Sequence, residues 1–342
     1  MNNADNHYLY LKYKKDRKIQ IAAKKCLFLS SVLALSVSMS VSMFAVADAT
    51  ENGLTHYPTN VNTVANGILP APGSAALDVY NQWYNAPSFA GPTGKSEVPG
   101  FDTSMFIVAP RILYTIPAEL NIIKGFNSAL TLGFIVPILN LNMELGPLYG
   151  QPATHGHIAG IGDVTFETDL SFDRPQKGFF SYIGFDTFFP TGSYRYGRLA
   201  NLGYNYRTFE PQYNLTWFVN RGLALNETFV FDINTTNKAN GYHSGADFEN
   251  DYAVNYAPFQ KLAPNVNVGF QGYIYKQIQN DTQYGTVYNN GNKGQSFGVG
   301  PQILIRMFGG KGGVLIKYTH QFAVRNQAKG DKLWVEFAVP IG

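Results

Sequence analysis

The chain has 342 residues, of which 45% are hydrophobic, 15% aromatic and only 14% charged, whereas ordinary soluble domains have about 25% charged residues. Residues 1–47 hold seven of the 26 basic and two of the 23 acidic side chains, so the formal net charge of +3 becomes −2 in the remainder, with 19 basic and 21 acidic residues. This balance argues against a nucleic-acid-binding protein, and the single cysteine excludes a disulfide framework.

Residues 1–47 have the pattern of a secretory signal peptide. Seven lysines and arginines precede an apolar run at 27–46 that contains six serines, and the small residues Ala-Val-Ala at 45–47 end it. A positive region, an apolar run and an A-x-A site are the three parts of such a peptide. We expect cleavage after position 47, with position 49 as the alternative. A permanent membrane anchor is the competing interpretation, which the serines disfavour.

The segments that follow alternate apolar and polar residues with a period of two, as β-strands with one apolar face do. A lead-in containing the Pro/Gly-rich stretch 67–73 comes first, so we divide the mature chain into 48–100, the lead-in and first strand, and 101–342, the rest of the fold. Strands are predicted at 73–88, 102–116, 127–144, 161–173, 178–190, 206–219, 223–236, 247–258, 264–278, 295–308, 313–325 and 331–341.

The strands and their connections predict a membrane barrel. Most strands reach the 9–11 or so residues that a tilted strand needs to cross a membrane. The connections alternate between short ones (173–177, 220–222, 258–264, 309–313) and longer ones (90–100, 146–160, 191–205, 236–246, 279–294). Short periplasmic turns and long outer loops are typical of outer-membrane barrels. We therefore predict an all-β fold, an antiparallel up-and-down transmembrane barrel of about 12 strands in the outer membrane of a Gram-negative bacterium. A secreted soluble β-sandwich is the alternative.

The charged face of each strand is assigned to the lumen, because a charge facing lipid near the membrane centre costs roughly 2–4 kcal/mol. The predicted pore-lining residues are Arg111, Asp163, Glu167, Asp169, Asp186, Glu210, Gln212, Asn214, Asp232, Tyr273, Tyr275, Arg306, Lys317, Trp334 and Glu336. The stretch 129–141 is apolar on both faces, which predicts contact with an apolar lumen wall or an inserted segment. Whether 67–73 enters the pore is left open by the sequence.

The inward charges are unevenly distributed around the predicted barrel. Arg111, Arg306, Lys317 and Arg325 come from the second, tenth and eleventh predicted strands, whereas acidic residues concentrate on the fourth to eighth. This arrangement predicts a transverse electric field across the pore. Reversal of Arg306 and Lys317 to glutamate should then change the ion selectivity in planar-bilayer recordings, and an unchanged selectivity would remove both residues from the constriction.

Inward aromatic side chains have two interpretations. They stack with aromatic solutes along a path through the pore, or they pack against a plug or at the membrane interface. The residues concerned are Tyr182, Phe188, Phe218, Tyr273, Tyr275 and Trp334.

An ordered series of motifs resembles one protein family. The first is Glu51-Asn-Gly-Leu-Thr-His-Tyr-Pro58 with Leu69-Pro-Ala-Pro-Gly73, and the second is Gly160-Ile-Gly-Asp-Val164. The third is Phe189-Pro-Thr-Gly-Ser-Tyr194, continued by Asn201-Leu-Gly-Tyr-Asn205 and Thr208-Phe-Glu-Pro211. The series is similar to the outer-membrane proteins linked to the meta-pathway of phenol degradation. The resemblance implies an outer-membrane barrel that passes aromatic or other hydrophobic compounds.

Two further groups of residues match a metal-binding or a hydrolase pattern only in part. His155 and His157 lie in a predicted outer loop at metal-ligand spacing, but no cysteine or further histidine lies nearby, so loop polarity is the better interpretation. His243, Ser244 and Asp247 invite comparison with outer-membrane lipid hydrolases, yet no nucleophile elbow is present. The remote alternative of a lipid hydrolase rests on these three residues.

The acidic series Asp163, Glu167 and Asp169 offers oxygen ligands for calcium, but its spacing is wide for a single ion. Solvation in the lumen and pairing across strands are the preferred interpretation. We therefore predict no catalytic residue, no metal and no cofactor. The expected function is a channel for small aromatic or hydrophobic compounds, with a structural or adhesive barrel of closed lumen as the alternative. The expected partners are outer-membrane lipid, small solutes and the barrel-assembly machinery.

Overall fold

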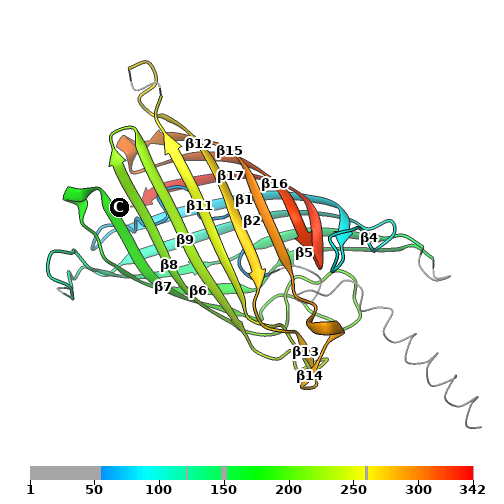
Figure 1. Ribbon diagram of the computed structural model, residues 1–342. Coiled ribbons are helices and arrows are strands. Elements are labelled where there is room, and N and C mark those ends of the chain that lie inside the picture. Colours follow the sequence, from blue (N-terminus) through cyan, green and yellow to red (C-terminus); the bar gives the residue numbers. More distant parts are fainter. Residues whose placement is uncertain (1–54, 121, 148–151, 259–260, 342) are drawn as a thin grey trace, which may run out of the picture. The chain divides into compact units, whose positions relative to one another are not determined.

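The computed structural model describes residues 55–120, 122–147, 152–258 and 261–341, so the predicted signal peptide lies outside the described residues. The described residues form seventeen strands, of which fourteen make one antiparallel sheet. They are β1(Ala75–Ala90), β2(Asp102–Thr115), β3(Leu130–Ile135), β4(Ile138–Leu145), β5(Thr154–Ile161), β6(Val164–Ser171), β7(Phe179–Phe189), β8(Thr208–Asn220), β9(Leu223–Asn234), β11(Asp247–Tyr256), β12(Val266–Gln277), β15(Gln295–Met307), β16(Gly312–Arg325) and β17(Gln327–Ile341) (Figure 1). The short strands β10(Tyr242–His243), β13(Thr282–Gln283) and β14(Thr286–Val287) form a separate sheet in the outer loops.

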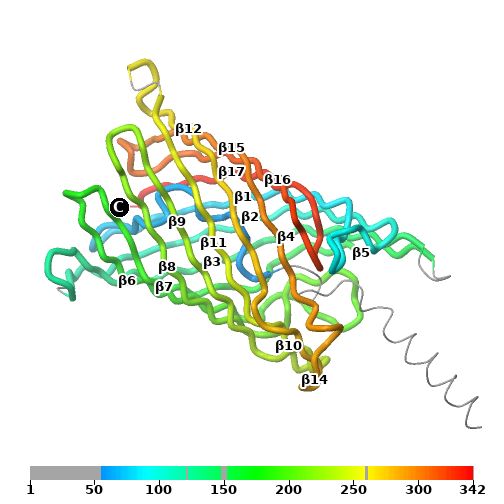
Figure 2. Tube along the Cα trace, in the orientation of Figure 1, coloured from blue at the N-terminus to red at the C-terminus, as the bar shows by residue number. Residues whose placement is uncertain are grey.

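The large sheet closes on itself. β1 pairs along most of its length with β2 on one side and with β17 on the other, so the first and last strands are neighbours (Figure 2). The pieces β3 and β4 together occupy one position in the ring, and so do β5 and β6. The result is a closed antiparallel barrel of 12 strands, as the alternating pattern predicts.

The outer half of the barrel departs from the predicted strand boundaries. The predicted strand 127–144 is divided at Val136 and Pro137, because proline has no N–H for the sheet and restricts the residue before it. The predicted loop 146–160 contains β5, which pairs with β4. His155 and His157 therefore belong to a strand, where His157 Nε2 is 3.1 Å from Asn140 Oδ1 and His155 Nδ1 is 3.4 Å from Glu144 Oε1.

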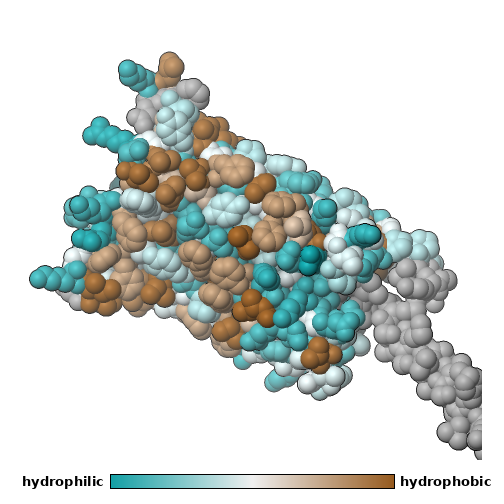
Figure 3. Space-filling view, viewed as in Figure 1, coloured by the Kyte–Doolittle hydropathy of each residue, from teal (hydrophilic) through white to brown (hydrophobic). Residues whose placement is uncertain are grey.

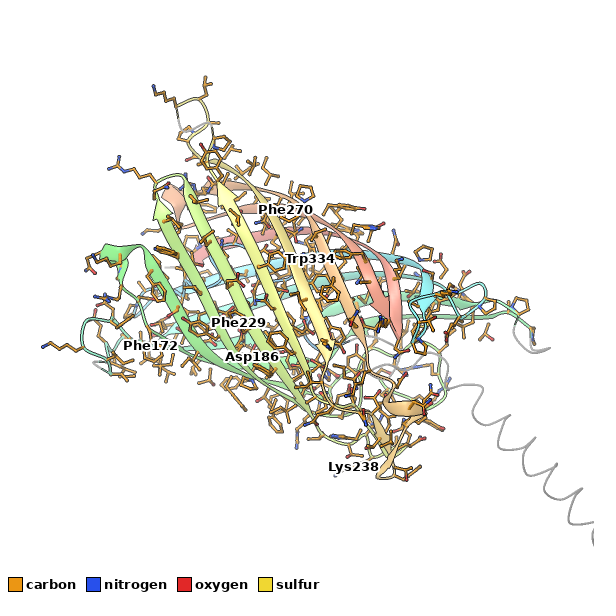
Figure 4. The ribbon with its side chains drawn as sticks, in the orientation of Figure 1. Phe172, Asp186, Phe229, Lys238, Phe270 and Trp334 are labelled. Atoms are coloured by element: carbon orange, nitrogen blue, oxygen red, sulfur yellow. The ribbon has the colours of Figure 1, made fainter. Side chains whose placement is uncertain are left out.

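The two faces of the wall differ as the alternation predicts. Large apolar side chains such as Phe229 and Phe270 are exposed on the outer face, whereas Asp186 and Trp334 are buried inside (Figure 4). In the space-filling view, hydrophobic residues gather over the strands and hydrophilic ones over the loop end near β13 and β14 (Figure 3). No helix among the described residues is long and apolar enough to span a membrane.

Candidate functional site

Residues 55–73, here called the plug, run through the lumen ahead of β1. Asn60 lies at the centre of the plug's attachment: its backbone N–H donates to Asp251 Oδ1 at 2.8 Å, and its Nδ2 donates to Gln271 Oε1 and Thr319 Oγ1, both at 2.6 Å. The hydroxyl of Tyr57 donates to Asp251 Oδ2 at 2.7 Å. Polar side chains of β11, β12 and β16 therefore find partners in the plug as well as in the wall.

Two lysines, on β16 and the adjacent β17, bind carbonyl oxygens of the plug. Lys317 Nζ donates to Val61 O at 2.8 Å and forms a 2.6 Å ion pair with Glu336. Lys332 Nζ donates to Thr59 O at 3.1 Å. The ammonium of Lys317 lies 5.0 Å from the ring centre of Trp334, and that of Lys332 lies 5.1 Å from that of Tyr273, so cation–π attraction supplements the hydrogen bonds.

The Pro/Gly-rich stretch 67–73 is the periplasmic end of the plug. The N–H of Gly67 donates to Thr216 Oγ1 at 3.0 Å, and Thr115 Oγ1 donates to Pro70 O at 2.8 Å. A Cβ atom on Gly67 would lie 2.4 Å from Phe180 O, so only glycine fits against the wall here. Gly67 is buried against the wall, whereas Ile68 and residues 71–73 are exposed, so only the start of this stretch lies inside the barrel.

The outer end of the plug is held by one carboxylate. Asp163 lies in the break between β5 and β6. Its Oδ1 accepts a hydrogen bond from the N–H of Gly192 at 2.8 Å. Its Oδ2 accepts the N–H of Tyr204 and is 2.9 Å from His56 Nε2. A Cβ atom on Gly203 would lie 2.3 Å from Asp163 Oδ1, which explains a glycine beside this carboxylate.

These contacts bring the resembling motifs together in space. Asp163 belongs to the Gly-Asp motif, Gly192 and Tyr204 to the two loop motifs, and His56 to the N-terminal motif. The ring of His56 stacks on Phe188 at 5.0 Å, and its Nδ1 is 2.6 Å from Thr208 Oγ1. We call this set the Asp163 junction; it joins the plug, the strand break and the loop 190–207.

The barrel wall is interrupted beside the Asp163 junction. Among the described residues, β5 pairs only with β4, while β6 continues the ring by pairing with β7. The loop 190–207 lies against the inner face of β5: Cβ atoms on Gly156 and Gly160 would contact Leu199 and Leu202 at 3.1 and 2.9 Å. The small residues of β5 therefore allow the loop to lie close against it.

A cavity of about 220 Å³ lies between the plug and the wall formed by β2, β3 and β4. Its apolar lining from these strands includes Met105, Ile107, Ala109, Ile135, Leu139 and Leu141. The inner face of the stretch 129–141 thus lines an apolar lumen wall, as one of the two sequence interpretations predicts. Phe188 and Trp334 line the same cavity.

Phe218 and Arg325 lie on the face opposite to the one that the alternation predicts. Phe218 is 41% exposed at the periplasmic end of β8, where the register shifts between Phe218 and Asn220. Ala323 has φ +50°, and this bulge turns Val324 inward and leaves Arg325 exposed. Phe218 and Arg325 were therefore assigned to the wrong face. Tyr182 is buried inside the barrel but does not line the cavity.

Most predicted pore-lining residues are buried on the inner face of the wall. Those with less than a tenth of their surface exposed are Arg111, Asp163, Glu167, Asp169, Asp186, Glu210, Gln212, Asn214, Asp232, Tyr273, Tyr275, Lys317 and Trp334. Glu336 is half-buried against Lys317, and Arg306 is half-buried at the periplasmic end, where it donates to Pro264 O. That these residues line a conducting path, and that their charges select ions, stay predictions.

Sequence reasoning missed the residues of the plug, above all His56, Tyr57 and Asn60, because an irregular segment has no period to reveal its face. The charged faces that the period of two assigns to the lumen also include Asp247, Glu249, Asp251 and Lys332, and all four are buried inside.

Ser244 and His243 show no arrangement for catalysis. The Ser244 hydroxyl, His243 Nδ1 and Asp247 Oδ1 have no hydrogen-bond partner among the described residues. Nearby, Asp281 accepts the N–H of Gly245 at 2.8 Å and Asn292 Nδ2 at 3.2 Å. Burial raises the pKa of Asp281, and these hydrogen bonds lower it in part. Asp281 thus has a structural role in the outer loops.

Comparisons with known proteins agree with this architecture. An outer membrane channel from Pseudomonas putida F1 is similar over 84% of this chain and 100% of its own, with 15% identity and a TM-score of 0.65. The transport unit of the autotransporter AIDA-I from Escherichia coli covers 78% of this chain and 89% of its own, with 7% identity and a TM-score of 0.43. The first likeness shows the fold, that of an outer-membrane barrel. No curated protein sequence matches the chain.

The sequence profile of one family matches residues 87–337 and is described as "Putative MetA-pathway of phenol degradation". This match includes the motifs at 160–164 and 189–211, and it confirms the resemblance that they indicate. The chain therefore belongs to this family, described as "Putative MetA-pathway of phenol degradation".

Proposed function

We propose that this protein is an outer-membrane channel for small apolar compounds, chiefly those with a single aromatic ring, and that it makes or breaks no covalent bond. The observation that carries the proposal is the apolar cavity between the plug and β2–β4. Its volume of about 220 Å³ exceeds that of the roughly 150 Å³ apolar cavity that accommodates benzene in another protein. A monocyclic compound with small substituents therefore fits.

The chemistry of the lining supports the same class of solute. Leu139, Leu141 and Met143 offer apolar surface, and Tyr80 and Tyr84 add aromatic faces. Burial of apolar surface contributes about 25 cal/mol per Å², so a hydrophobic solute gains free energy here without a specific polar partner. The carboxylates on β6, β7 and β8 would repel an anion, which disfavours charged aromatic acids.

The plug supports the runner-up function, a structural barrel with a closed lumen. It hydrogen-bonds to the wall at both ends and in the middle, so it occupies part of the lumen. Under the channel function, a solute passes once the plug is displaced, or beside the loop 190–207, where β5 has no second neighbour among the described residues. Under the structural alternative, solute uptake would not depend on the protein at all.

A cavity-filling variant tests the proposal. Ala109→Phe places a phenyl ring in the cavity and should lower uptake of labelled toluene and phenol about tenfold or more, the factor that corresponds to 1.4 kcal/mol. The matched control is Val108→Phe, which places the same phenyl ring on the lipid face of β2. Heat-modifiable gel migration verifies that both variants fold.

Uptake is compared in cells with and without the protein, for toluene, phenol and a fatty acid. We expect the protein to accelerate uptake of the two monocyclic compounds over the fatty acid. Equal uptake of all three with and without the protein would refute the channel function for these solutes. Equal effects of Ala109→Phe and Val108→Phe would place the path outside the cavity.

A further inference from the structure

Three carboxylates meet on the inner wall; none of them lines the apolar cavity, although the neighbouring Glu210 does. Asp232 of β9 lies directly opposite Asp247 of β11, and Glu249 follows two residues later on the same face. All three side chains are at most 1% exposed, and one oxygen atom of each lies within 4.8 Å of the others. Because all three are ordinarily anionic, they repel one another unless something positive lies between them.

Glu210 shares a side-chain hydrogen bond with Asp232, but four oxygen atoms of the group lack a donor among the described residues. Both carboxylate oxygens of Glu249, one oxygen of Asp232 and one of Asp247 have no hydrogen-bond partner among the described residues. The hydroxyl of Tyr275, which faces Glu249 across the strand pair, has none either. A fully buried carboxylate without a donor is costly, so Glu249 in particular points to a missing positive ligand.

The nearest cations are engaged elsewhere. Lys332 donates to Thr59 of the plug, and His56 bonds to Asp163 and Thr208. The neighbouring strands add more acid, because Glu210 pairs across the sheet with Asp186, whose place on the inner wall is labelled in Figure 4. One oxygen of Glu210 also lacks a partner among the described residues. Protein cations therefore do not balance this part of the lumen.

We propose that Asp232, Asp247 and Glu249 bind a hard divalent cation, with Ca²⁺ the ion that fits best. Ca²⁺ takes about 6–8 oxygen ligands at about 2.3–2.6 Å and accepts bidentate carboxylates, so the three carboxylates offer up to about six oxygens. Glu210 is the further ligand. A site made only of oxygen donors disfavours zinc and copper, which prefer nitrogen and sulfur.

The ion would join two strands to the plug. Asp232 accepts a backbone hydrogen bond from Tyr57, so the site touches the plug close to the Asp163 junction. Binding Ca²⁺ there offsets two of the three negative charges beside the plug and stabilises the closed barrel. This inference does not depend on which solute the channel carries.

The test uses the purified mature chain in detergent, stripped with EDTA at neutral pH and titrated with CaCl₂ or MgCl₂ in a calorimeter. We expect one Ca²⁺ per chain, weaker binding of Mg²⁺, and a rise in the unfolding temperature with Ca²⁺. Glu249→Gln and Asp247→Asn should each lower the Ca²⁺ affinity at least about tenfold. The matched control is Asp169→Asn, an equally buried carboxyl on β6, which should leave the affinity unchanged.

Two results would overturn the proposal. One is the absence of both binding heat and thermal stabilisation with Ca²⁺, which would leave proton sharing among the carboxyls as the explanation. The other is Ca²⁺ binding that Glu249→Gln and Asp247→Asn leave intact, which would place the ion in the outer loops. If either variant fails to fold, Asp232→Asn tests the same group from the neighbouring strand.

Discussion

Replacing Asp163 with alanine is expected to release the outer end of the plug and to open the channel in planar bilayers. The substitution removes the acceptor for Gly192, Tyr204 and His56 at once. Each hydrogen bond to a charged group contributes about 1.5–3 kcal/mol. Loss of about 3 kcal/mol of plug attachment would raise the released fraction about a hundredfold.

The measurement is the open probability in single-channel recordings of the variant and the parent protein. Asp331→Ala is the matched control, because Asp331 forms a His–Asp pair with His320 at 2.7 Å that is exposed and does not touch the plug. We expect the control to behave like the parent. If Asp163→Ala stays closed while remaining folded, the Asp163 junction does not hold the plug.

Deletion of residues 55–66 is expected to produce a permanently open pore. A barrel of about eight strands is filled by its own side chains, whereas one of about 16 leaves a water channel, so a 12-stranded wall without its plug leaves space. The wall itself keeps all its strand pairings, since the plug forms none of them. Cells with the variant should become sensitive to large hydrophilic antibiotics that the outer membrane normally excludes.

A point variant provides the graded version of this deletion. Asn60→Gly removes the side chain that binds Gln271 and Thr319 but tolerates the positive φ of +73° at this position. We expect brief openings with Asn60→Gly and sustained ones with the deletion. An unchanged conductance of the deletion variant, with normal heat-modifiable migration, would show that another part of the chain closes the lumen.

The period of two was sufficient to predict the faces of the regular strands. Glu210, Gln212 and Asn214 alternate with apolar residues on β8, and all three are buried inside. The prediction works because a residue on a membrane strand has only two environments, lipid or lumen, and a charge tolerates only one of them. The strand number and the short turns followed from the same pattern.

The sequence was insufficient wherever the backbone leaves that period. Ala323 has a left-handed backbone conformation, and after it the residues that face the lumen and the lipid exchange places. An alanine side chain gives no sign of such a bulge in the sequence. Pro137 divides a strand that the pattern predicts as continuous, and β5 is predicted as a loop because glycines interrupt it. The cavity depends on the plug, the wall and the loop 190–207 together, so no single segment could predict it.

The plug has a consequence for the order in which the chain assembles. Its hydrogen bonds join residues that are far apart in sequence, 107 positions for His56 and Asp163 and 273 for Thr59 and Lys332. The strand that carries Lys332 is also the one that closes the ring against β1. Such long-range contacts form slowly, so closure is expected to be the late step of folding. Once the ring is sealed around it, the plug is threaded, and it can leave only lengthwise along the barrel axis.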